Sequence, residues 1–190
     1  MKWFFLMILV MMLTIILKTP AASGADGEKI FKKYCAKCHA EDGSVSEYGR
    51  DIKPKPARDL RTNRLFVAPK ELPIIIKYGL YGRGMPKWED VLNEEEILAV
   101  GAYVRTLKYT PDIKEGERLF NEKCFACHGK EGPAKKIFQA PDLDMSPLQA
   151  FDMGRVIRYG RHGTIMSPKE DLLTNPMIAD IIEYLQSIKK

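Results

Sequence analysis

Cysteine and histidine are scarce in this chain, which has four cysteines and three histidines among its 190 residues. Segments with the alternating pattern of β-strands are also scarce, so a fold built on a sheet is not expected. The formal net charge of +5 is modest, and no cluster of basic residues resembles a nucleic-acid-binding surface. The few cysteines and histidines therefore carry most of the chemical information.

All four cysteines and two of the three histidines fall in two copies of the sequence C-x-x-C-H, at residues 35–39 and 124–128. This pattern is typical of covalent attachment of a c-type haem. Two thiols three residues apart lie on one face of a helical turn and can form thioethers to one porphyrin, while the adjacent histidine binds the iron. We therefore expect two covalently bound haem c groups, with no thiol left for a catalytic nucleophile. The expected haem-binding residues are Cys35, Cys38, His39, Cys124, Cys127 and His128.

Three other uses of paired cysteines fit the sequence less well. A shared zinc site needs its two pairs about 15 to 20 residues apart, whereas roughly 85 residues separate Cys38 from Cys124. A thioredoxin-like redox motif needs a strand followed by a helix, which the flanking sequence lacks. Structural disulfides remain open for an exported chain, but cysteines three apart in a helix are poorly placed to bridge each other.

The first 25 residues have the outline of a secretory signal peptide. Lys2 precedes an apolar run from Trp3 to Leu17, and small residues follow up to Ala25. Cleavage there would start the mature chain near Asp26. The alternative is an uncleaved membrane anchor, although 15 apolar residues are fewer than the about 20 that a spanning helix needs. In both cases we expect the haem-bearing part in the periplasm or on the outer face of the cytoplasmic membrane.

The rest of the chain contains an internal repeat. The sequence Gly-x-x-x-Phe begins eight residues before each haem motif, at Gly27 and at Gly116. Near the other end of each unit, a Tyr-Gly pair stands seven residues ahead of a methionine, at residues 78–85 and 159–166. The repeat therefore indicates two similar domains in tandem. The predicted domains are residues 26–110 and 111–190.

Helical signals dominate both units, so we expect an all-α fold. Units of about 80 residues bury little apolar surface on their own, and a porphyrin would supply the missing core. Each unit is therefore predicted to be a small helical bundle wrapped around a haem. The expected helices are Glu71–Tyr78, Leu148–Tyr159, one opened by Asp112 with Glu115, one capped by Asn93 with Glu96, and one started by Pro176.

A haem iron with one histidine needs a second axial ligand or keeps an open position. In the first unit Met85 is the best candidate, because it lies between Gly84 and Pro86 in a glycine-rich loop where the backbone can approach a haem closely. Met85 as ordinary core filler is the alternative. A methionine in this place favours electron transfer, whereas an open position favours an enzyme.

In the second unit, Met166 occupies the position that corresponds to Met85. Met145 is a rival but falls far too early in the repeat. His162, the only spare histidine, is the fallback ligand. Two other methionines, Met153 and Met177, fall on predicted helices and are expected to pack in the core.

Several polar side chains near the methionine loops are candidates for haem propionate contacts. Trp88 could donate its indole N–H, and four cations could act likewise. For each of them an ordinary solvated side chain is an equally good interpretation. The four cations are Arg83, Lys87, Arg158 and Arg161.

The order of these motifs resembles a class I cytochrome c domain, present twice. The resemblance covers essentially all of residues 26–190, and its layout is similar to cytochrome c4 and to the dihaem cytochrome subunit of cbb3-type oxidases. It implies an all-α fold, iron ligated by His39 with Met85 and by His128 with Met166, and one-electron transfer. The second methionine loop departs from the pattern, since it has Ile165 and Ser167 around the methionine and no tryptophan after it.

These inferences together predict an exported dihaem cytochrome that is an electron-transfer protein and not an enzyme. Its expected partners are redox proteins, namely a membrane-bound quinol-oxidising complex and a terminal oxidase or reductase, with no nucleic acid. One alternative is a dihaem enzyme such as a peroxidase or a sulfur-compound dehydrogenase. Another is a membrane-anchored cytochrome subunit of a larger respiratory complex.

Overall fold

A computed structural model describes residues 24–190 of the chain. Residues 1–23, which hold nearly all of the predicted signal peptide or anchor, lie outside the described part. Within residues 24–190 the fold is helical, and its one β-type pairing is an isolated bridge between Leu80 and Met85. No helix among these residues is both long enough and apolar enough to cross a membrane. The predicted all-α fold is therefore confirmed for the part described.

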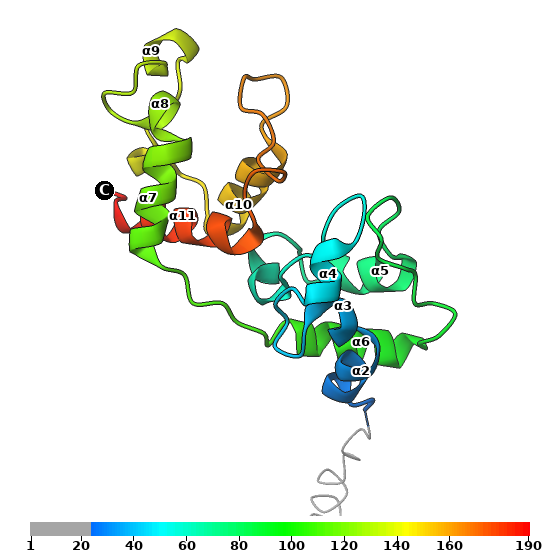
Figure 1. Cartoon of the computed structure of the whole chain (residues 1–190). Coiled ribbons are helices and arrows are strands. Elements are labelled where there is room, and N and C mark those ends of the chain that lie inside the picture. The colour runs from blue at the N-terminus through cyan, green and yellow to red at the C-terminus, as the bar shows by residue number, and fades with distance from the viewer. Residues whose placement is uncertain (1–23) are drawn as a thin grey trace, which may run out of the picture.

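The helices fall into two groups that follow each other along the chain (Figure 1). The first group comprises α2 (Gly27–Tyr34), α3 (Ala36–His39), α4 (Glu47–Asp51), the 3-10 helix η1 (Leu60–Leu65), α5 (Glu71–Tyr78) and α6 (Glu94–Val104). The second group comprises α7 (Ile113–Lys123), α8 (Phe125–His128), α9 (Lys135–Phe138), the 3-10 helix η2 (Leu143–Met145), α10 (Ala150–Tyr159) and α11 (Asn175–Ser187).

The first and last long helices of each group cross at a glycine. A Cβ atom on Gly27 of α2 would collide with the backbone oxygen of Ala99 in α6, and one on Gly116 of α7 would collide with that of Asp180 in α11. Only glycine allows the two helix backbones to come this close. A tilted aromatic pair packs beside each crossing, with ring centroids 5.3 and 5.4 Å apart. The two pairs are Phe31 with Tyr103 and Phe120 with Tyr184.

Local capping signals explain where two of the helices begin. The capping box of α6 is present, because Asn93 accepts from the backbone N–H of Glu96 and the Glu96 carboxylate accepts from that of Asn93. The box predicted for α7 is only half formed. Asp112 does cap the helix, but its own backbone N–H donates to Asp180 at 2.9 Å, and the Glu115 carboxylate binds Arg118 instead.

Each group of helices has its own apolar core. The core of the first contains Ile30, Phe31, Leu72, Ile76, Leu92, Ile97, Val100 and Val104. The core of the second is built mainly from α7, α10 and α11, but it also includes Phe66, which follows η1 in the first group and is only 2% exposed. The two groups therefore share part of one core.

Arg158 of α10 also lies in this shared region, on the side of the second group. Its guanidinium lies 3.6 Å from the centre of the Phe66 ring, and its side chain is almost fully buried. Burial lowers the pKa of Arg158 to about 10, which still leaves it charged at neutral pH. The interpretation of Arg158 as a solvated side chain is wrong, because the side chain is buried against the Phe66 ring.

Candidate functional site

The first C-x-x-C-H motif borders a cleft that is open to solvent. Both its cysteines and its histidine line this cleft, and so does Met85 from the loop between α5 and α6. Sequence segments almost 50 residues apart therefore meet around one space, as predicted for a haem site. The lining residues are Tyr34, Cys35, Cys38, His39, Ile52, Ala57, Arg83, Gly84, Met85, Pro86 and Trp88.

The helical turn of this motif explains the placement of its thiols. Cys35 ends α2, where its backbone N–H donates to Phe31 at 2.8 Å, and the short helix α3 follows at once. The N–H groups of Cys38 and His39 both donate to the carbonyl of Cys35, so residues 35–39 form one tight turn. Burial raises the pKa of the Cys35 thiol to about 11, which keeps it protonated at neutral pH.

A backbone carbonyl orients His39. Nδ1 of its ring lies 2.9 Å from the carbonyl oxygen of Arg58, and this geometry suits an Nδ1–H that donates. Nε2 then keeps its lone pair, which is the arrangement typical of a metal-ligating histidine. Burial lowers the pKa of His39 despite the hydrogen bond to Arg58, so the neutral imidazole is favoured.

The loop that carries Met85 turns on three glycines with positive φ angles, Gly79 at 69°, Gly82 at 71° and Gly84 at 74°. The backbone N–H of Leu80 donates to the carbonyl of Met85 at 3.1 Å and closes the loop. Met85 is half-buried against the first core. Met85 therefore lines the cleft and also packs against the first core, and its assignment as an iron ligand stays a prediction.

The second C-x-x-C-H motif is built in the same way. Cys124 ends α7 and donates to the carbonyl of Phe120 at 2.8 Å, and burial raises the pKa of its thiol to about 11. Nδ1 of His128 lies 3.2 Å from the carbonyl oxygen of Pro141. Both histidines therefore have a backbone acceptor for one ring nitrogen and leave the other available.

The loop of Met166 repeats the geometry of the first methionine loop. Gly160 and Gly163 have φ angles of 72° and 75°, and the backbone N–H of Arg161 donates to the carbonyl of Met166 at 2.9 Å. Each of these features corresponds to one in the loop at residues 79–85. The register of the repeat is thus retained in three dimensions, although Ile165 and Ser167 replace a glycine and a proline.

The rival residues of the second unit lie in less suitable places. Met145 is 74% exposed at the end of η2, and His162 is an exposed residue of the loop tip. Met153 is 4% exposed in the second core, and Met177 packs against that core, as expected for both. Met166, which is half-buried, remains the predicted ligand.

Trp88 lines the first cleft and packs edge-on against Tyr34, with ring centroids 5.5 Å apart. The second unit has Lys169 at the corresponding position. Among the cations proposed as propionate partners, Lys87 instead pairs with Asp90 at 2.8 Å. Arg83 lines the cleft but also binds Glu170 of the second unit, an interaction that the sequence alone does not indicate.

The residues around the first cleft fit a haem c. They supply two neighbouring thiols, a neutral imidazole and a thioether within a lining that is mostly apolar. Thioethers and imidazoles are the axial ligands of cytochromes c. A structural zinc site would instead need about four clustered ligands. Among residues 24–190, no group of three or more His, Cys, Asp and Glu residues is arranged to hold a metal ion.

The fold and the two sites define a dihaem c-type cytochrome with two cytochrome c domains in tandem. Residues 22–104 and residues 111–185 each match the family described as cytochrome c oxidase, cbb3-type, subunit III. The chain belongs to this family. Its two domains bind covalent haem c.

The chain is similar to curated proteins described as cbb3-type cytochrome c oxidase subunit FixP. It is 27% identical over 178 residues to the cbb3-type cytochrome c oxidase subunit FixP of Sinorhizobium medicae, covering 85% of this chain and 59% of the relative. It is 34% identical over 109 residues to FixP of Bradyrhizobium diazoefficiens, covering 53% of this chain and 37% of the relative. The chain thus spans less than two thirds of the length of either relative.

Two solved structures are also similar in part. One is a reducing HAO-like protein complex of Kuenenia stuttgartiensis, with 22% identity, a TM-score of 0.38, and coverage of 87% of this chain and 96% of that one. The other is a c-type cytochrome, KustC0563, with 24% identity, a TM-score of 0.39, and coverage of 44% of this chain and 99% of that one. At these scores neither structure bears on function.

Proposed function

We propose that this chain is an exported cytochrome that passes single electrons from a membrane-bound quinol-oxidising complex to a terminal oxidase or reductase. The observation that carries the proposal is the repeated arrangement: each domain has a histidine oriented by a backbone carbonyl and a methionine on a loop that turns at glycines with positive φ angles. Two sites in which both axial positions of the iron are filled would suit electron transfer better than substrate turnover. The chain itself is therefore proposed to be a carrier and not a catalyst.

The proposed assignment of residues is the same in both domains. Cys35 and Cys38 form the thioethers of the first haem, and Cys124 and Cys127 those of the second. When bound, the haem supplies a reversible one-electron couple. The proposed axial ligands of its iron are His39 with Met85 and His128 with Met166.

The protein side chains have three tasks in this proposal. The carbonyls of Arg58 and Pro141 hold the two imidazoles with Nε2 free to ligate. The methionine loops supply thioether sulfur, which favours reduced iron and raises its potential. The mostly apolar lining of the first cleft, in which Trp88 packs on Tyr34, would contact the apolar faces of the porphyrin.

We further propose that residues 26–110 and 111–190 are the two domains and that residues 1–25 direct the chain across the cytoplasmic membrane. The haem domains would then work in the periplasm or on the membrane's outer face. Support comes from the basic, apolar and small-residue sequence of the first 25 residues. Mass determination of the mature protein would show whether it starts at Asp26 and carries two porphyrins.

The family membership favours a cbb3-type oxidase as the electron acceptor. In that case the chain would be a cytochrome subunit of the oxidase rather than a free carrier. Affinity purification of the tagged chain from its native membranes distinguishes the two roles. A stoichiometric oxidase in the purified fraction supports the subunit, and a chain recovered alone supports the free carrier.

A redox titration of the purified holoprotein, combined with a ligand challenge, tests the carrier function. We expect two reversible one-electron transitions, low-spin iron in both domains, and slow or no binding of cyanide and peroxide. A high-spin ferric site that binds either reagent quickly and turns over peroxide would contradict the carrier and favour the dihaem enzyme.

A further inference from the structure

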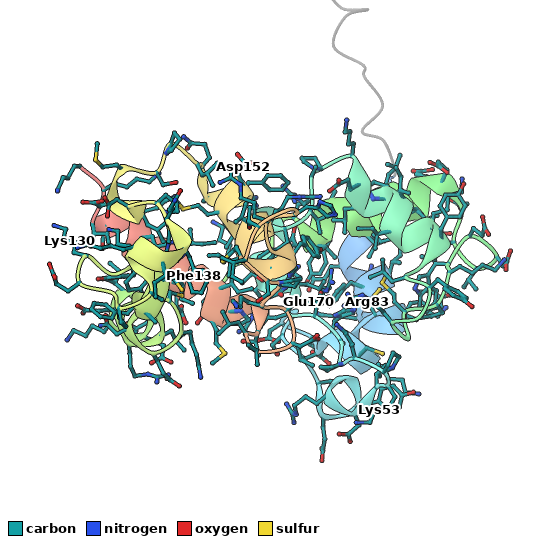
Figure 2. All side chains as sticks on the ribbon, turned by 90° about the horizontal axis from the view of Figure 1, so that it is seen from above. Lys53, Arg83, Lys130, Phe138, Asp152 and Glu170 are labelled. Atoms are coloured by element: carbon teal, nitrogen blue, oxygen red, sulfur yellow. The ribbon has the colours of Figure 1, made fainter. Side chains whose placement is uncertain are left out.

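Glu170 of the second domain lies among three cations of the first domain. Its carboxylate is 2.8 Å from Arg83, 3.1 Å from Lys55 and 3.4 Å from Arg58. Figure 2 shows Glu170 beside Arg83, between the two groups of helices. One carboxylate therefore offsets positive charge from three separate positions of the neighbouring domain.

One of these cations belongs to the wall of the first haem cleft, and the other two lie in the chain segment next to it. Arg83 lines the cleft two residues before Met85. Arg58 supplies the carbonyl that orients His39, and Lys55 lies in the segment between Ile52 and Ala57, which also line the cleft. Glu170 belongs to the second domain, which contributes no proposed ligand to the first haem site. Its carboxylate nevertheless lies at the charged edge of that site.

Glu170 is well placed to act as a fixed negative charge. Its side chain is only 18% exposed, so solvent screens it less than a surface carboxylate. Burial alone would raise the pKa of Glu170, but hydrogen bonds from Arg83 and Lys55 outweigh burial and hold that pKa below its ordinary value. It is therefore ionised at neutral pH.

We propose that Glu170 tunes the redox equilibrium of the first haem site from the second domain. The oxidised site carries one more positive charge than the reduced site, so a nearby carboxylate stabilises the oxidised form. Glu170 also offsets the charges of Arg83, Arg58 and Lys55, which would otherwise favour reduction. Docking of the second domain therefore lowers the potential of the first. This inference rests on the proposed assignment of Met85 and Met166 as ligands.

The neighbouring residue Asp171 provides a matched control. It pairs with Lys55 at 2.6 Å, yet its side chain is 73% exposed. D171N removes the same charge one residue away in a well-screened position. E170D is the second control, because it keeps the charge of Glu170 while it shortens the side chain.

The test is a mediated potentiometric titration of the two-haem protein, in which one electron per haem comes from a soluble redox mediator. A background substitution, M166H, lowers the potential of the second haem and separates the two transitions. We expect E170Q to raise the potential of the first haem, with a several-fold increase in its equilibrium constant for reduction. D171N and E170D should each shift it much less.

Two results would overturn the inference. One is a first-haem transition that moves no more in E170Q than in D171N. The other is an equal shift in E170D and E170Q, which would mean that Glu170 only maintains the packing of the domains. A wrong ligand assignment would be recognised separately. If Met166 is not a ligand, M166H alone would leave the potentials of both transitions unchanged.

Discussion

At the scale of single residues, glycines place the two methionines. Gly82 and Gly84 both adopt positive φ angles in the first loop, but their surroundings differ. A Cβ atom on Gly82 would meet open space, whereas one on Gly84 would collide with the side chain of Ile52 in the wall of the cleft. Substitution at either position causes backbone strain, but only substitution at Gly84 adds a collision with the wall of the cleft.

We predict that G84A displaces Met85 and that G82A does not. Both substitutions carry a left-handed backbone cost of about 1–2 kcal/mol, but only G84A adds a steric collision next to the proposed ligand. The measurement is the sulfur-to-iron charge-transfer absorption of the holoprotein. It should weaken in G84A and persist in G82A, and equal losses in the two variants would refute this role of Gly84.

At the scale of elements, much of the helical structure could be predicted from the sequence because its signals are local. The helix Glu71–Tyr78 was predicted with the bounds observed, and the capping box at Asn93 set the start of α6. The helix predicted over 148–159 begins two residues later, at Ala150, because its N-cap Gln149 has an extended backbone. The register of the methionine loops also followed from the repeat.

The helix crossings give a prediction at this scale. In G116A the new methyl group would collide with the backbone oxygen of Asp180, which cannot move without shifting α11. We expect the free energy of unfolding to fall by about 1–3 kcal/mol. Urea unfolding of the holoprotein measures the change.

G101A is the matched control, because it also places alanine in a helix that crosses another. Its methyl group would lie 3.7 Å from Ile76 and 3.9 Å from Pro73, which are ordinary contacts. Alanine favours a helix over glycine by about 1 kcal/mol, so G101A should be neutral or stabilising. A destabilisation equal to that of G116A would count against the crossing as the cause.

At the scale of the whole molecule, the contacts between the domains could not be predicted from the sequence. Phe66 lies outside the helices predicted from the sequence, and Arg158 follows Ile157 on an ordinary amphipathic helix. Nothing local indicates that the two side chains stack, or that Glu170 pairs with Arg83. Such pairings depend on how two folded units dock, which residue patterns within one unit do not encode.

Substitution of Phe66 should destabilise the second domain, although Phe66 belongs to the first domain in sequence. F66A removes a ring from the second core, and we expect a loss of about 3–5 kcal/mol. Thermal unfolding followed at the absorbance of the second haem should show the change. L98A, at a site that is 53% exposed, should have little effect. Destabilisation confined to the first domain in F66A would contradict the shared core.

The segment between the domains gives a pH prediction. The Tyr109 hydroxyl donates to Asp180 at 3.1 Å, and burial together with this carboxylate raises the pKa of Tyr109 to about 12. The folded state therefore keeps a proton that the unfolded state loses near pH 10. The resulting stabilisation is present below pH 10 and is lost as the pH rises to 12.

Unfolding of the wild type and of Y109F should be compared between pH 9 and pH 12. Wild-type stability should fall more steeply over this interval, because the variant has no phenol to titrate. Parallel curves would show that the Tyr109 hydroxyl is not held by Asp180 in solution.

The account as a whole depends on two equivalent sites, each closed by a methionine sulfur. Near-infrared magnetic circular dichroism of the oxidised holoprotein, scaled to its haem content, tests this most directly. We predict two methionine-to-iron charge-transfer bands per chain, with M85H and M166H each removing one. A wild-type spectrum with one band or none would contradict the account.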